Sequence, residues 1–212
     1  MINKIKEALA ALKTQFWHRR EKLGPITDEE KLAEFITSRA SMVGQTSLYG
    51  YIKTRAGTRF PELFKNDIFL ASINIAKWQI WAACVSDLVV YTGNLFYRED
   101  VQATQIRATM RSVVSLILET VGSPEEAGPD FNQSIEMIKK RLSSCEFDDI
   151  LELDTIFTQS PDALVHWSPI VDELKVLDED IVRNSIRFRW QEPRRELREA
   201  LQVGSLMNER LD

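Results

Sequence analysis

Residues 67–98 read DIFLASINIAKWQIWAACVSDLVVYTGNLFYR, and this stretch decides the fold. Its apolar side chains are spread around the whole circumference of a helix, so the helix must be covered on all sides by protein or by lipid. Lipid is disfavoured because Lys77 and Asp87 interrupt the run, and a charge near the centre of a bilayer costs at least ~2.5 kcal/mol. We therefore expect residues 67–98 to form the buried central helix of a bundle.

This helix also carries a stripe of polar and aromatic side chains at steps of three and four residues, which places them on one face. The stripe comprises Asn74, Lys77, Trp81, Cys84, Asp87, Tyr91 and Asn94. Lys77 and Asp87 lie ~15 Å apart along the helix, too far to pair with each other. Because a buried charge must be paired, we favour structural partners from elsewhere, an acid for Lys77 and an arginine for Asp87.

The alternative is that the stripe lines a cavity, since perturbed ionisable groups cluster at functional sites. The candidate ligand-binding residues would then be Asn74, Lys77, Trp81, Asp87 and Tyr91.

Outward from the central helix, periodic apolar segments separated by glycine and proline predict further helices. Thr27 with Glu30 has the pattern of a capping box, and Asp130 with Gln133 marks another helix start. The expected helices lie at about 27–55, 101–121, 130–144 and 147–157, with a loop at 56–66.

Two Ser-Pro pairs, Ser160-Pro161 and Ser168-Pro169, each combine an N-cap hydroxyl with proline at the first helical position and predict two more helix starts. The second opens a long segment that Pro193 interrupts, followed by a weak final helix. The periodic apolar residues of the long segment are Ile170, Leu174, Leu177, Ile181 and Phe188.

No strand or hairpin pattern appears in the chain. At 212 residues it has the length of one domain with one core. The prediction is therefore an all-α, single-domain bundle of about six to eight helices around the central one.

Residues 1–23 form a basic amphipathic segment, expected as an N-terminal helix distinct from the bundle at 24–212. Its apolar stripe needs a cover, which could be the bundle, a protein partner or a second copy of the chain. An anionic membrane surface is the other possibility. The segment lacks an uninterrupted apolar run and a small-residue cleavage site, and the two cysteines form no disulfide framework, so we expect a cytoplasmic protein.

Charge is uneven along the chain. Residues 145–182 hold eleven acidic residues and one lysine, whereas residues 183–198 hold six arginines and two glutamates. Mutual neutralisation within the fold is the favoured interpretation, and a surface for an acidic or phosphate-bearing partner is the alternative. Candidate anion or partner contacts are Lys53, Arg55, Arg59, Arg187, Arg189, Arg194 and Arg195. The net charge of −5 speaks against specific nucleic-acid binding.

No motif indicates catalysis. His18 and His166 belong to no metal-binding pattern, the chain has no nucleophile elbow, and we expect neither a metal nor a cofactor.

The leading hypothesis is therefore a non-catalytic helical adaptor, assembly factor or scaffold protein, with residues 1–23 and 183–198 as contact surfaces. One alternative is a small-molecule-binding or catalytic bundle with its polar site on the central helix. Another is a peripheral protein of a membrane surface.

Overall fold

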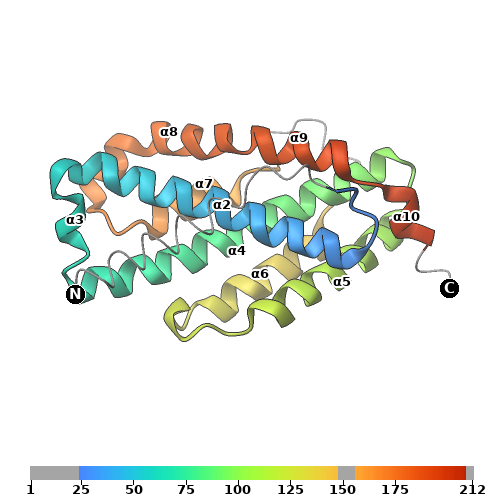
Figure 1. Ribbon diagram of the computed structural model, residues 1–212, viewed down its shortest axis with the longest axis horizontal. Helices are drawn as coiled ribbons and strands as arrows, with labels where there is room; N and C mark the ends of the chain where they lie inside the picture. Colours follow the sequence, from blue (N-terminus) through green and yellow to red (C-terminus); the bar gives the residue numbers. More distant parts are fainter. Residues whose placement is uncertain (1–23, 148–155, 209–212) are drawn as a thin grey trace.

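Residues 67–98 form α4 (Asp67–Arg98), which runs along the long axis of an all-α bundle (Figure 1). The computed structural model describes residues 24–147 and 156–208. The Asn66 side chain begins α4 by accepting hydrogen bonds from the backbone N–H groups of Ile68 (2.9 Å) and Phe69 (3.1 Å). These bonds satisfy donors that the first turn of a helix leaves unpaired. The expected bounds of the central helix are confirmed.

The helices around α4 cover it with apolar side chains from several directions. By length and composition alone α4 could cross a membrane, yet half of its most apolar stretch is buried by protein in this fold. It packs against α2, α5, α6 and α7. The covering helices are α2 (Glu29–Ala56), α5 (Ala103–Val121), α6 (Phe131–Ser144) and α7 (Gln159–Trp167).

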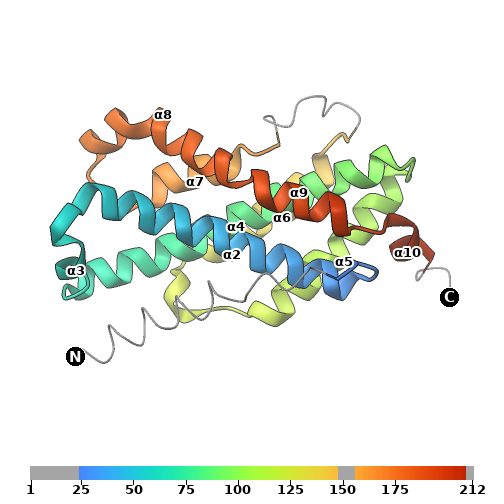
Figure 2. The same ribbon diagram turned by 45° about the horizontal axis from the view of Figure 1, so that its top comes forward.

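The last third of the chain forms an outer layer. α8 (Asp172–Arg189) and α9 (Gln191–Ala200) follow one another along one long side of the molecule, opposite the edge formed by α5 and α6 (Figures 1 and 2). α8 packs on α7 and α2. The short helices α3 (Phe60–Leu63) and α10 (Val203–Asn208) lie at opposite ends of the bundle.

The start of the described chain is tied to its end. The Ile26 N–H donates to the carbonyl of Ala200 (2.8 Å), and the Gln202 N–H donates to the carbonyl of Ile26 (3.0 Å). The side chain of Ile26 is buried, so this isolated bridge closes the bundle across α2 and α9.

Three sequence predictions about helix starts need correction. The N-cap of α2 is Asp28 rather than Thr27, and its side chain accepts from the Lys31 N–H (2.8 Å). α7 begins at Gln159, so Ser160 lies inside its first turn. Ser168 ends α7 instead of starting α8, because its hydroxyl donates back to the carbonyl of Leu164 (2.6 Å).

Other segments differ less. The expected loop at 56–66 contains a 3₁₀ turn and α3. The long C-terminal segment breaks at Trp190, and Pro193 fits into the first turn of α9, where its missing N–H is not needed. Of the helix expected at 147–157, residues 148–155 lie outside the described part, as do residues 1–23; Phe147, Ile156 and Phe157 are not helical.

Candidate functional site

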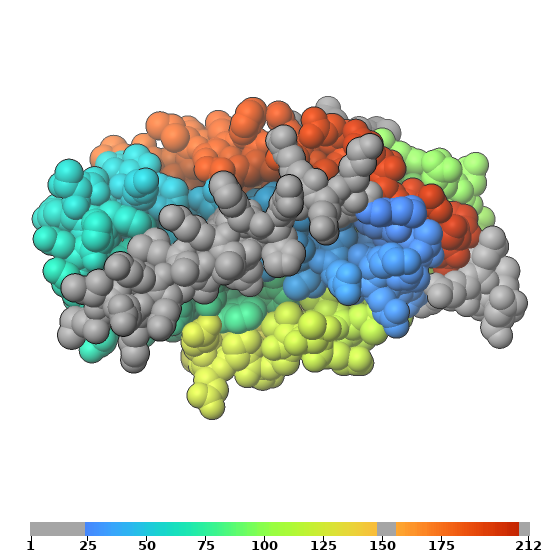
Figure 3. Space-filling model, viewed as in Figure 1, coloured from blue at the N-terminus to red at the C-terminus, as the bar shows by residue number. Residues whose placement is uncertain are grey.

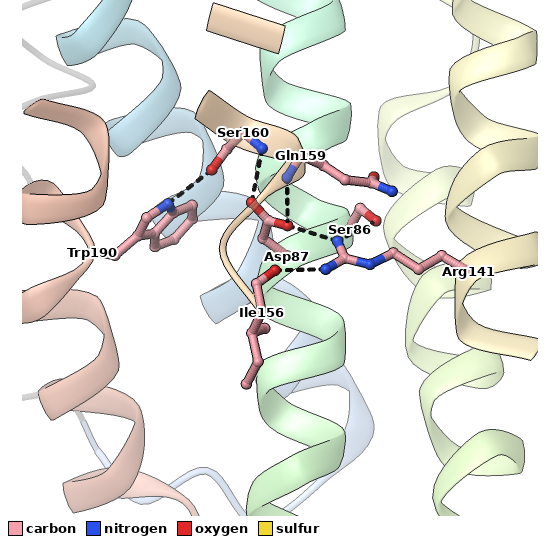
Figure 4. Close-up of polar contacts among 7 residues, drawn as sticks. All are labelled: Ser86, Asp87, Arg141, Ile156, Gln159, Ser160 and Trp190. Carbon is pink, nitrogen blue, oxygen red and sulfur yellow. Dashed lines mark hydrogen bonds and ion pairs between the residues drawn. The ribbon is translucent and has the colours of Figure 1, made fainter. Parts of the chain in front are cut away.

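Asp87 sits at the centre of a buried polar network between α4, α6 and α7 (Figure 4). Its carboxylate is fully buried and accepts a hydrogen bond from Arg141 Nη1 (2.6 Å). It also accepts from the backbone N–H groups of Gln159 (3.2 Å) and Ser160 (2.8 Å) in the first turn of α7. Charge pairing, orphan backbone donors and the positive end of the α7 dipole thus converge on one carboxylate.

Arg141 and Ser160 extend this network to the rest of the bundle. Arg141 Nη2 donates to the carbonyl of Ile156 (2.5 Å), and Nη1 also reaches Ser86 Oγ (3.2 Å). Ser160 Oγ accepts from the indole N–H of Trp190 (3.0 Å), at the junction of α8 and α9. The network therefore joins α4, α6, α7 and the junction of α8 and α9 around the buried carboxylate of Asp87.

The electrostatics of the network indicate a structural role. Burial raises the pKa of Asp87 above its ordinary value, while Arg141 and Ser160 oppose that shift. Burial also raises the pKa of the neighbouring Cys84 thiol, and the Asp87 charge adds to that effect. A thiol held protonated in the core is unreactive. The contacts of Asp87 and Arg141 join α4, α6 and α7.

Lys77 lies ten positions earlier on α4, towards the surface. Its Nζ donates to Glu126 Oε1 (2.6 Å), and the indole N–H of Trp78 donates to the same oxygen (3.0 Å). These donors lower the pKa of Glu126 below its ordinary value. The expected partners of both charges, an acid for Lys77 and an arginine for Asp87, are confirmed.

The remaining stripe residues point to different neighbours. Trp81 packs against Trp78 and Phe131, with ring centroids 5.7 and 6.3 Å away. The Tyr91 hydroxyl accepts from Arg198 Nη1 (2.8 Å), and Asn74 is half-buried. The structure therefore does not gather the five candidate ligand-binding residues into one site.

An open hollow of about 710 Å³ does border α4, but on another face. It lies between α4, α6, α7 and α8 and is lined by residues such as Gln79, Met137, His166 and Trp167. None of the five stripe candidates lines it. The hollow has no signature in the sequence because its walls come from four separate segments.

The charged residues around this hollow are occupied by one another. Arg183 is ion-paired with Asp162 and with Glu179. Lys175 donates to the carbonyl of His166 (3.0 Å) and lies 3.3 Å from Asp172. These charged groups at the hollow are thus paired with other groups of the same chain.

Several arginines of residues 183–198 contact other parts of the same chain. The ion pairs of Arg183 with Asp162 and Glu179 agree with the expected neutralisation of the acidic segment by the arginine-rich one. Arg194 lies over the rings of Tyr91 and Phe157, 5.7 and 5.6 Å from their centroids. Arg195 lies near Glu192 (3.7 Å) and Glu199 (3.9 Å) on its own helix.

The other candidate cations are scattered. Arg55 is ion-paired with Asp178 of α8. Lys53 and Arg59 are exposed, whereas Arg187 and Arg189 are half-buried. The structure therefore assembles no single anion site from the seven candidates.

Three of the periodic apolar residues of the long C-terminal segment lie on an exposed face of α8. The side chains of Leu177 and Ile181 are each 74% exposed, and Phe188 is 69% exposed. The same helix buries Val182 and Ile186 instead. We call Leu177, Ile181 and Phe188 the α8 outer face. The α8 segment, coloured orange, runs along one edge of the molecule in Figure 3.

Comparisons with known proteins add no family to this description: no family model, no curated protein sequence and no solved structure matches the chain. Within the described residues, no group of three histidine, cysteine or acidic side chains is arranged to hold a metal ion.

Proposed function

We propose that this protein is a non-catalytic helical adaptor or scaffold that binds protein through the α8 outer face. The observation that carries the proposal is the exposure of Leu177, Ile181 and Phe188 on a helix whose other side is packed into the core. Apolar surface gains ~25 cal/mol for each Å² removed from water. Contiguous apolar patches on a folded domain are typical of contact surfaces.

The chemistry of the interior supports a non-catalytic role. Asp87, the fully buried carboxylate of α4, has its oxygens occupied by Arg141 and by two backbone donors. A general acid or base must reach a substrate proton, and Asp87 is sealed from solvent by three helices. The contact role expected of residues 1–23, with protein or with a membrane, concerns residues outside the described part and stays a prediction.

Site-specific photo-crosslinking in the native host tests this proposal. A photoreactive phenylalanine derivative replaces Ile181 in one variant and Lys140, an exposed polar position of α6, in the control. We expect a protein adduct at position 181 and none at position 140. Absence of an adduct at 181, or equal adducts at both positions, would overturn the proposal.

A further inference from the structure

The α8 outer face has the spacing of a helix-pairing seam. Leu177, Ile181, Asn184 and Phe188 follow one another at steps of four, three and four residues, which is the a/d pattern of helices that pack side by side. Three of these four side chains are apolar and exposed, and Asn184 is exposed between them. A single polar residue in such a seam fixes the register and orientation of the partner helix.

The charges of α8 are divided between its two halves. The N-terminal half carries five acidic residues and one lysine, and the C-terminal half carries three arginines. The acidic residues are Asp172, Glu173, Asp178, Glu179 and Asp180, and the arginines are Arg183, Arg187 and Arg189. A uniformly basic or acidic partner helix would match one half of α8 and repel the other.

A reversed copy of the same helix matches both halves. In an antiparallel pair, each edge of the seam lies along the same edge of the partner helix. Asp180 and Arg187 occupy the same edge, each one residue before an apolar seam position. Two-fold symmetry then brings Asp180 of each copy to Arg187 of the other, so two ion pairs form together.

These two charges are available for such a contact. Asp178 and Arg183 are already engaged by Arg55 and Asp162 within the chain. Among the described residues, Asp180 and Arg187 form no ion pair, and Asp180 is exposed. Arg187 also has a buried Nε without a hydrogen-bond partner, so its outer nitrogens are the ones that can reach a second chain.

We infer that the partner of the α8 outer face is a second copy of this chain, bound antiparallel through α8 in a two-fold symmetric dimer. This inference rests on the proposed docking function of that face and names its occupant. In this arrangement Ile181 and Asn184 of the two copies lie beside the two-fold axis. Leu177 of one copy packs against Phe188 of the other at each end of the seam.

Sedimentation velocity of the full chain over a concentration series tests the dimer. The expected species is a reversible dimer of twice the 24.4 kDa chain mass. Ile181→Asp should abolish it. The matched control is Ile68→Asp on α4, a side chain that is 80% exposed and belongs to another helix, and it should leave the dimer intact. A monomer at all concentrations, or a dimer insensitive to Ile181→Asp, would overturn the inference.

Charge swaps test the orientation. Asp180→Arg and Arg187→Asp should each weaken the dimer by about tenfold or more, because each places like charges together twice. The combined swap should restore wild-type affinity, and helix content by circular dichroism should be unchanged in all three variants. Failure of the combined swap to restore the dimer would overturn the antiparallel pairing.

Two further outcomes separate this inference from the function on which it rests. A crosslinked adduct at position 181 that contains a different protein, from a chain that sediments as a monomer, overturns the dimer and leaves the docking function standing. Loss of the dimer on deletion of residues 1–23, with α8 unchanged, overturns the assignment to α8 in favour of the N-terminal segment.

Discussion

Folded proteins usually bury apolar side chains and expose charged ones. Asp87 and the α8 outer face are opposite exceptions: Asp87 is a buried charge, and the α8 outer face is exposed apolar surface. Around Asp87 a charge lies at the centre of the core, and Arg141 with the start of α7 supplies every interaction it needs. On α8, large apolar side chains lie in water without any cover. The buried charge of Asp87 finds its partners within the chain, whereas the exposed apolar side chains of α8 do not. This difference makes the α8 outer face the better candidate for a contact with another molecule.

The free energies expected for a buried ion pair and for exposed apolar side chains agree with this difference between the two regions. A buried ion pair contributes little net stability, but removing one partner leaves an unpaired buried charge at high cost. Exposed apolar side chains contribute little to the fold and gain free energy when another surface covers them. Removing one member of the buried network should therefore destabilise the bundle, whereas the α8 outer face is left for association.

The largest effect is expected from Arg141→Met, which leaves Asp87 buried without its cation. The free energy of unfolding should fall by ~3–5 kcal/mol, measured by urea denaturation. Arg111→Met is the control, because Arg111 is exposed and its described hydrogen bond, to Ser143 Oγ, is 3.5 Å long. Equal losses in the two variants would show that the Asp87 network does not hold the core.

A smaller effect is expected from Gly93→Ala in α4. A Cβ at this position would overlap the ring of Phe147 and lie 3.1 Å from Ile106 Cγ2, so the core must shift at a cost of ~1–3 kcal/mol. Gly50→Ala in α2 is the control. Its Cβ would meet Arg189 Nη2 at an ordinary 3.6 Å, so helix propensity should stabilise this variant by up to ~1 kcal/mol. A tolerated Gly93→Ala would mean that the interior is looser than described.

The smallest effect concerns the Lys77–Glu126 pair near the surface. Lys77 and Trp78 hold the pKa of Glu126 below its ordinary 4.5, so the folded state favours the ionised form. The stability from this pair is present above about pH 4.5 and is lost as the pH falls through the lowered pKa. It should amount to less than ~1 kcal/mol because Glu126 is partly exposed.

Glu126→Gln should therefore flatten the acid side of the stability profile, measured by thermal unfolding at a series of pH values. Glu125→Gln, which removes the adjacent exposed carboxylate, should leave the slope unchanged. If both variants show the wild-type slope, the Lys77 contact does not contribute to the pH dependence.

The sequence predicted the central helix well because the apolar circumference of residues 67–98 requires cover on all sides, which the neighbouring helices provide. It also predicted the kind of partner that Lys77 and Asp87 require, because burial dictates the opposite charge. It could not identify Glu126 and Arg141, which lie 49 and 54 residues away along the chain. Residues so far apart in the sequence are brought together by tertiary packing, and the periodicity of apolar residues does not predict which of them will meet.

Predictions from local sequence patterns were wrong where the atoms concerned form tertiary contacts instead of local ones. Ser160 has the pattern of an N-cap, but its N–H binds Asp87 and its hydroxyl binds Trp190. α8 has apolar residues on two faces, so periodicity alone does not decide which face is buried. Packing against α7 and α2 selects Val182 and Ile186 and leaves Leu177, Ile181 and Phe188 outside.

The central claim, that the two faces of α8 have different roles, is tested most directly by alanine substitution of the same residue type on each face. Ile186 is fully buried and Ile181 is 74% exposed. In urea unfolding at concentrations where the chain is monomeric, Ile186→Ala should lower the free energy of unfolding by ~2–5 kcal/mol. Ile181→Ala should change it by less than ~0.5 kcal/mol. A loss at Ile181 as large as the loss at Ile186 would contradict the account, because it would place the α8 outer face inside the core of the single chain.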